Sequence, residues 1–228
     1  STWSLFEDRE GNIWVGTFGG GVCKFNGERF VYFNEEGGLV NNAVSGIIED
    51  HNGNIWFSTE VGISKYDPVA AGKGEAGISN FTSVNGETIS KLTSLVEDSV
   101  GTIWFSSYMG RGYKYRDGKF IQAEIGNHFL YKDYLGNIWL GSDGGGAIKI
   151  TGDTVVPYLI GKDHNVNRIL YIYEDSKGNM WFGCYIGGIN IFDGSTTKHI
   201  SAKDALSEKG LRFTNKMVLG IAEDETGR

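Results

Sequence analysis

Short apolar segments recur along the chain, and glycine or a polar turn breaks each one before it could fill a helix. Apolar residues alternate with small or polar ones in segments such as Val44–Ile48, Leu92–Val96 and Ile169–Tyr173. Alternation with a period of two is typical of strands that bury one face. Only Ala202–Lys209 could make two helical turns, whereas helical repeats need apolar faces over ten or more residues. The pattern therefore predicts an all-β chain.

The same signature surrounds five tryptophans, spaced by roughly 40 residues, a period typical of propeller repeats. Each Trp closes the motif Asp-x-x-Gly-Asn-Ile-Trp or a close variant, and a Glu precedes the Asp except in the fourth repeat, which has Lys132. A sixth copy begins at Glu223 and reaches Arg228 before its Trp. The five tryptophans are Trp14, Trp56, Trp104, Trp139 and Trp181.

Each repeat predicts four antiparallel strands. The first strand precedes the Asp, Asp-x-x-Gly forms a hairpin turn, and the second strand carries the Trp. A glycine-rich turn leads to a third strand such as Ile63–Tyr66, and a weaker fourth strand such as Ile78–Phe81 follows. Four-stranded meanders that recur with this period predict a β-propeller.

The repeats predict five blades and the first strand of a sixth, Met217–Ala222, within one propeller domain over residues 1–228. We expect this to be part of a larger, seven-bladed propeller whose remaining blades the parent chain supplies. Closure of the five blades on themselves, with the last strand left over, is the alternative. The expected blades are 1–36, 37–85, 86–126, 127–163 and 164–203, and the next blade starts within 213–228.

The repeated residues are expected to be structural. The Trp ring can fill the wedge between adjacent blades, because isolated blades cannot cover both of their faces. The acidic turn lacks the distant Glu and the flanking helices of an EF-hand calcium loop, which favours turn chemistry over a cation site. An Ala- and Gly-rich insert, Val69–Gly77, interrupts the second repeat.

Composition removes several classes of function. The net charge is −7 with both signs interspersed, so the chain offers no basic stripe to nucleic acid. Cys23 and Cys184 allow one disulfide at most and are interpreted as two small buried thiols. The four His are scattered without ligand spacing, so neither a metal site nor a cofactor is expected.

The motifs resemble the two-component regulator propeller repeat over essentially the whole chain. The likeness lies in Glu-Asp-x-x-Gly-Asn-Ile-Trp-Val-Gly-Thr and in the link Gly38–Val44, where Val40 replaces that family's Pro. The resemblance implies a periplasmic sensor region of a membrane-bound hybrid histidine kinase. It further implies an oligosaccharide ligand, a relay to the kinase, and a possible homodimer through the parent receptor.

When the repeats are aligned, the residue four positions after each Trp differs from repeat to repeat, although the positions around it are similar. We call this position the variable column. Such a column on a propeller rim predicts ligand specificity, since aromatic rings stack on sugars and acids accept hydroxyl bonds. Ordinary solvated loop residues are the alternative interpretation. The column is Phe18, Glu60, Tyr108, Asp143 and Tyr185, and the loops nearby add Asn41, Asn42, Arg111, His164, Asn167 and Arg168.

An enzyme is not expected. Gly-Asn-Ile-Trp-Phe also resembles streptogramin lyases, which are propellers that use a His and a metal. The His residues of this chain do not fall in matching repeat positions, and the sequence shows no nucleophile elbow or phosphate loop. A scaffold for protein interaction or dimerisation is the main alternative to a sensor, and a lyase-type propeller is the weaker one.

Overall fold

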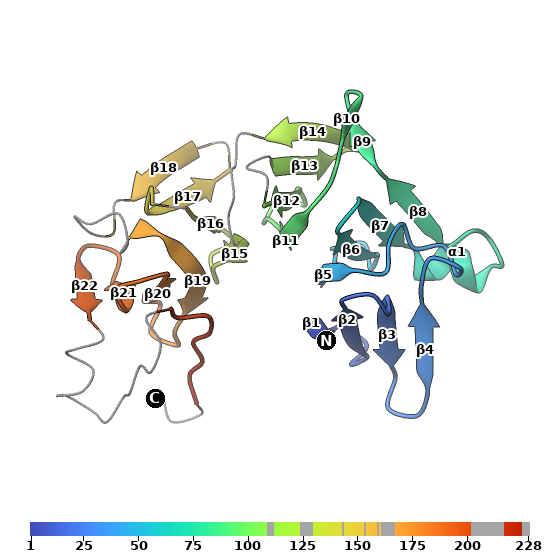
Figure 1. The fold of residues 1–228 in the computed structure, drawn as a ribbon, viewed down its shortest axis with the longest axis horizontal. Helices are drawn as coiled ribbons and strands as arrows, with labels where there is room; N and C mark the ends of the chain where they lie inside the picture. The colour runs from blue at the N-terminus through green and yellow to red at the C-terminus, as the bar shows by residue number, and fades with distance from the viewer. Residues whose placement is uncertain are drawn as a thin grey trace. The chain divides into compact units, whose positions relative to one another are not determined.

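The computed structural model describes residues 1–108, 112–123, 130–142, 144–152, 154–158, 160, 167–201 and 217–224. Antiparallel sheets dominate these ranges (Figure 1). The chain divides into two compact units. The first unit consists of Ser1–Glu97 with Gly101–Gly126, and the second of Asp98–Val100 with Asn127–Arg228.

The first unit contains three four-stranded sheets in which each strand pairs with the next along the chain. The first strand of each sheet carries a β-bulge where it pairs with the second. The sheets are β1 (Thr2–Glu7), β2 (Ile13–Thr17), β3 (Val22–Phe25) and β4 (Phe30–Phe33); β5 (Val44–Glu49), β6 (Ile55–Thr59), β7 (Ile63–Tyr66) and β8 (Ile78–Phe81); and β11 (Leu92–Glu97), β12 (Ile103–Ser107), β13 (Gly112–Arg116) and β14 (Lys119–Ala123).

The second unit contains two further sheets with the same order of strands. The prediction of an all-β chain with five four-stranded antiparallel blades is therefore confirmed. These sheets are β15 (Leu130–Lys132), β16 (Ile138–Gly141), β17 (Ala147–Thr151) and β18 (Thr154–Tyr158); and β19 (Ile169–Glu174), β20 (Met180–Cys184), β21 (Ile189–Phe192) and β22 (Thr197–Ile200).

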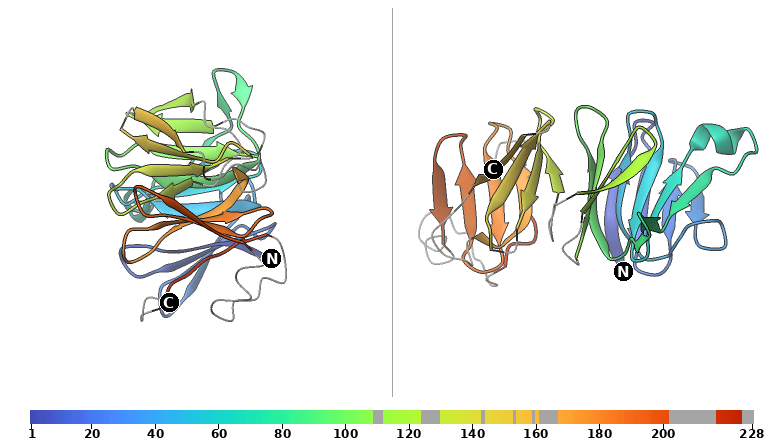
Figure 2. Two further views of the ribbon diagram at one scale, coloured as in Figure 1. Left: turned by 90° about the vertical axis from the view of Figure 1, so that its left-hand side faces the viewer. Right: turned by 90° about the horizontal axis from the view of Figure 1, so that it is seen from above.

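Two elements lie outside this meander pattern. The insert of the second blade contains the short helix α1 (Pro68–Gly72), whose N-cap Asp67 accepts hydrogen bonds from the amides of Val69 and Ala70. A small hairpin of β9 (Ser83–Val84) and β10 (Glu87–Thr88) precedes the third blade. Figure 2 shows the helix, in teal, at the outer edge of its blade. The sequence pattern did not predict either element, since each is too short for a periodicity.

Met217–Ala222, predicted as the first strand of the sixth blade, is not assigned to a strand in the structure. Val218 is nevertheless buried, and its N–H donates to the carbonyl of Cys184 over 3.1 Å. The helical segment considered at Ala202–Lys209 lies outside the described residues.

The signature turn is organised around one buried carboxylate in four of the five blades. In the second blade, Asp50 accepts from the Asn54 backbone and side chain and from the Trp56 indole, all within 2.8–3.1 Å. Gly53 closes the turn with φ at +83° and donates its N–H to the Asp50 carbonyl. Burial raises the pKa of Asp50, but the hydrogen bonds from Trp56 and Asn54 outweigh burial and leave that pKa below its usual value. The same bonds recur around Asp8, Asp133 and Asp175.

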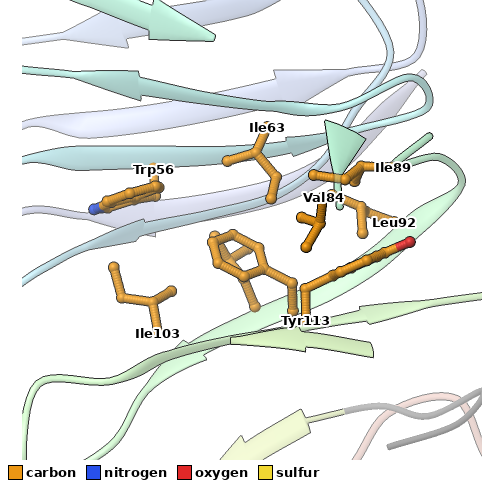
Figure 3. Packing of buried hydrophobic residues seen from close by; sticks show 9 residues of the cluster. Trp56, Ile63, Val84, Ile89, Leu92, Ile103 and Tyr113 are labelled. Atoms are coloured by element: carbon orange, nitrogen blue, oxygen red, sulfur yellow. The ribbon is translucent and has the colours of Figure 1, made fainter. Parts of the chain in front are cut away.

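The signature Trp fills the space between successive blades of one unit, as predicted. Trp56 is fully buried, and its ring centroid lies 5.9 Å from that of Phe105 and 4.8 Å from that of Tyr115, both in the third blade. Figure 3 shows Trp56 and Ile63 above the strands that carry Ile103 and Tyr113. Lys65 covers the ring at 5.6 Å, a cation–π contact that screens the indole from water.

Candidate functional site

Three residues of the variable column lie along one continuous path of backbone hydrogen bonds in the first unit. Phe18 pairs with Ala43 in an isolated bridge, and Ala43 accepts from the N–H of Glu60 over 3.1 Å. The Glu60 carbonyl accepts from Lys91 over 2.6 Å, and the Lys91 carbonyl accepts from Tyr108 over 2.9 Å. The residue that enters each following blade thus connects two members of the column. We call Phe18, Glu60, Lys91 and Tyr108, together with Trp3, the rim arc.

The side chains of the rim arc remain open to solvent. Phe18 is 56% exposed and Tyr108 is 69% exposed, while Glu60 and Lys91 are also exposed. Large aromatic rings gain little by facing water, so their exposure beside charged groups is typical of a binding surface. The arc offers flat apolar faces, one carboxylate and one ammonium to a ligand.

Trp3 and Lys91 belong to this arc although the sequence interpretation did not include them. The ring centroids of Trp3 and Phe18 lie 4.5 Å apart, and Trp3 is 49% exposed. Trp3 sits at the bulge between Thr2 and Ser4, where a strand aims one side chain away from its regular face. Lys91 adopts a left-handed φ of +51°. The period-two pattern does not reveal either feature.

The loop between the first two blades uses its asparagines to hold itself together. The Asn42 side chain accepts from the N–H of Glu35, and the Asn42 carbonyl accepts from Gly19 and Gly21. The Asn41 amide donates to the Glu35 carboxylate and accepts from Ala43. Asn41 is half-buried. Its hydrogen-bonding groups therefore brace the loop that positions the rim arc.

In the second unit, Arg168 lies over the face of Tyr185, with its guanidinium carbon 3.8 Å from the ring centroid. The Tyr185 N–H donates to the Arg168 carbonyl, which repeats the link between Tyr108 and Lys91. Asn167 is only 4% exposed, and its side chain accepts from the N–H of Ile160. Asn167 thus occupies the bracing position of Asn42 and does not present its amide to a ligand.

Three further predicted site residues, Arg111, Asp143 and His164, lie outside the described residues. Two compact units contain the other members of the variable column, so Phe18, Glu60 and Tyr108 form one group, and Tyr185 with Arg168 another.

A thiol, an amide and an imidazole form a chain in the fifth blade. The Asn190 amide donates to the Cys184 sulfur over 3.0 Å, and His199 Nδ1 lies 2.8 Å from the Asn190 carbonyl oxygen. Because that oxygen can only accept, His199 donates from Nδ1. Burial raises the pKa of Cys184 to about 11, so the thiol stays protonated at neutral pH and is a poor nucleophile.

Among the described residues, no group of three or more His, Cys, Asp or Glu side chains is arranged to hold a metal ion. No helix within the described ranges has the length and apolar character that crossing a membrane requires.

Solved structures with a similar fold include propellers of different kinds. A domain described as the extracellular part of a hybrid two-component system from B. thetaiotaomicron matches with a TM-score of 0.76 and 19% identity, over 100% of this chain and 31% of that one. A second such domain from the same organism matches with a TM-score of 0.68 and 20% identity, over 88% and 31%. Virginiamycin B lyase from Staphylococcus aureus matches with a TM-score of 0.71 and 18% identity, over 90% and 71%.

These identities establish the fold alone, and the chain spans about a third of the length of the two extracellular domains. A search of curated protein sequences found no match. The two-component regulator propeller family matches the chain over residues 1–19, 38–61 and 163–185. These segments include the first, second and fifth signatures, each of which builds the buried Asp–Trp turn described above. The chain is a β-propeller polypeptide in which three segments match the two-component regulator propeller repeat.

Proposed function

We propose that this chain is part of the extracytoplasmic, periplasmic sensor propeller of a two-component receptor, and that it recognises an oligosaccharide and relays its presence to a histidine kinase. The repeat family supports the receptor context. The extracellular two-component domains with the same fold support the compartment. The side chains of the rim arc indicate the class of ligand.

The main observation in favour of a sugar ligand is the exposed aromatic pair Trp3 and Phe18, whose ring centroids lie 4.5 Å apart. Phe18 lies on the same hydrogen-bonded path as Glu60 and Tyr108. Sugars present apolar C–H faces and a rim of hydroxyls, so they match aromatic platforms flanked by charged acceptors and donors. Glu60 accepts hydroxyl hydrogen bonds, and Lys91 donates them. Tyr185 under Arg168 offers a second stacking surface in the other unit.

Thermal unfolding in the presence of an oligosaccharide panel tests this proposal. A ligand at about 100 times its Kd stabilises the protein by roughly 2.7 kcal/mol, a shift that is readily measured. We expect Phe18→Ala and Tyr108→Ala to abolish the shift without lowering the melting temperature of the free protein. Tyr134→Ala is the matched control, because Tyr134 is 74% exposed, lies in an Asp-x-x-Gly turn and does not belong to the rim arc.

A sugar-dependent shift that survives both rim substitutions would contradict the proposed site. If no oligosaccharide shifts the transition, the scaffold alternative, in which the propeller binds another protein or a second receptor, takes precedence. For the relay itself, we expect a binding sugar to change kinase autophosphorylation in the full-length receptor, and Phe18→Ala to remove that change. We propose no catalytic activity for the chain; turnover of a streptogramin by the purified protein would contradict this.

A further inference from the structure

Lys91 holds a backbone conformation that lysine rarely adopts. It is one of three described non-glycine residues with a positive φ, and the other two, Asn85 and Asp117, each precede a glycine in a tight turn. Asn and Asp tolerate the left-handed region because their short polar side chains bond locally. Lysine lacks this compensation, so its φ of +51° costs conformational free energy that glycine would avoid. A lysine at this position therefore indicates a role for its side chain.

The backbone around Lys91 fixes its place on the rim. Its N–H donates to the Glu60 carbonyl over 2.6 Å, and its carbonyl accepts from the Tyr108 N–H over 2.9 Å. Lys91 thus stands between a carboxylate residue and a tyrosine that is 69% exposed. The side chains of Lys91 and Glu60 are both exposed, and neither forms an ion pair with a described residue. The ammonium of Lys91 is therefore available to a ligand.

The fifth blade repeats this arrangement with an arginine. Arg168 directly precedes β19, as Lys91 directly precedes β11, and its carbonyl accepts from the Tyr185 N–H over 2.8 Å. In both blades, a cation at the entry of the blade is joined through the backbone to a tyrosine of the variable column. In the second blade the entry residue is the uncharged Ala43, and the column residue joined to it is Glu60. Cation and tyrosine therefore occur together in these blades.

Given the sugar-sensing function proposed above, on which this assignment rests, we propose that the ligand of the rim arc is an acidic oligosaccharide and that the Lys91 ammonium binds the carboxylate of a uronic acid residue. The Tyr108 ring stacks on the apolar face of the same sugar ring. The ammonium and the carboxylate form a charge-assisted hydrogen bond, while Glu60 accepts from sugar hydroxyls. Because the chain carries a net charge of −7, an acidic ligand depends on this local cation.

Calorimetric titration with matched ligands tests this assignment. The probes are trisaccharides of galacturonic, glucuronic and mannuronic acid, each compared with its methyl ester, which keeps the sugar ring and removes the charge. We expect at least one acid to bind about tenfold more tightly than its ester. Lys91→Gln should weaken the binding of that acid by about tenfold and leave the ester unchanged. Lys91→Arg, which keeps the charge, should retain the preference for the acid.

Lys91→Gly distinguishes the role of the side chain from the cost of its backbone conformation. Glycine adopts a left-handed φ without strain, so we expect this variant to lose the preference for the acid while its melting temperature stays equal or rises. Lys119→Gln is the control, because Lys119 is exposed on β14 and does not belong to the rim arc. We expect it to change neither the preference nor the melting temperature.

Equal binding of every acid and its ester would overturn the acidic ligand and leave sugar sensing intact. Binding of neutral sugars alone would have the same meaning. The role of Lys91 would be refuted if Lys91→Gln left the acid unaffected, weakened acid and ester alike, or had no more effect than Lys119→Gln. If no oligosaccharide binds, acidic or neutral, the proposed function and the acidic ligand both fail.

Discussion

The indole nitrogen of Trp56 donates a hydrogen bond to the buried carboxylate of Asp50 over 2.8 Å. This bond joins the second strand of the blade to the turn that starts it, and Asn54 completes the shell around the same carboxylate. One side chain thus fixes the turn and orients the ring that packs against the next blade.

Removal of this carboxylate should therefore weaken the whole first unit. Asp50→Ala leaves the Trp56 and Asn54 donors unpaired in a buried site, and each such group costs about 1–3 kcal/mol. We expect a loss of at least about 2 kcal/mol in the free energy of unfolding, measured by urea titration. Glu36→Ala is the control, because an exposed carboxylate without such a network changes stability by less than about 0.5 kcal/mol.

Acid should destabilise the protein through the same carboxylates. Burial raises the pKa values of Asp8, Asp50 and Asp175, but hydrogen bonds to Trp and Asn side chains outweigh burial, so each folded-state pKa lies below the ordinary value of 3.8. The unfolded chain then binds more protons, so stability is fully present well above pH 3.8 and falls as the pH drops through the folded-state values. Melting temperatures between pH 6 and pH 3 measure this loss. Asp50→Asn should show a shallower decline, and an unchanged slope would contradict the assignment.

The His51 N–H of the second blade donates a hydrogen bond to the Glu97 carboxylate of the third blade. This bond predicts that the two residues are energetically coupled. Glu97→Ala removes the acceptor of the His51 N–H, and we expect it to cost about 1–2 kcal/mol, because hydrogen bonds to charged groups exceed neutral ones. A double-mutant cycle with His51→Ala isolates the ring contribution from that of the backbone. Glu7→Ala in the isolated chain is the matched control. Glu7 occupies the same position in the first blade, and its carboxylate has no hydrogen-bond or ion-pair partner among the described residues. Equal losses of unfolding free energy in Glu7→Ala and Glu97→Ala would refute a stabilising role for the Glu97–His51 hydrogen bond.

The glycine turn after the second strand provides a steric test. Gly21 has φ at +73°, and a Cβ there would lie 2.1 Å from the carbonyl oxygen of Phe33, which is backbone and cannot swing aside. Gly19 also has a positive φ, +109°, but a Cβ there meets nothing within 4 Å. We expect Gly19→Ala to cost about 1 kcal/mol for its left-handed conformation. Gly21→Ala should cost clearly more, by thermal or urea unfolding, and similar losses would show that the turn can relax.

The fold was largely predictable because its information is local and repeated. The Asp, Gly and Trp of each signature lie within seven residues, so one turn and its hydrogen bonds recur wherever the motif does. The short elements were missed for the same reason: α1 and the β9–β10 hairpin occur once and are shorter than any period. Met217–Ala222 was expected to form a strand and is not assigned to one, since a strand is assigned only where it pairs with a partner, and propensity does not supply that partner.

The candidate site was only partly predictable. The position four residues after each Trp pointed to Phe18, Glu60 and Tyr108, and the structure brings these onto one path. Sequence could not distinguish the exposed Phe18 from the buried Asn167, because burial depends on which loop folds over which. It also could not find Trp3, which reaches Phe18 through a bulge.

The amino-acid sequence by itself determined the repeat, the four-stranded blade and the structural role of Trp56, because turns and strand alternation are set by residues close together in the chain. Only the tertiary structure decided what the Glu of the signature does. Glu49 and Arg9 are 40 positions apart, and their hydrogen bond exists because successive blades stack with their turns side by side. Contacts of that range depend on packing geometry, which no local pattern encodes.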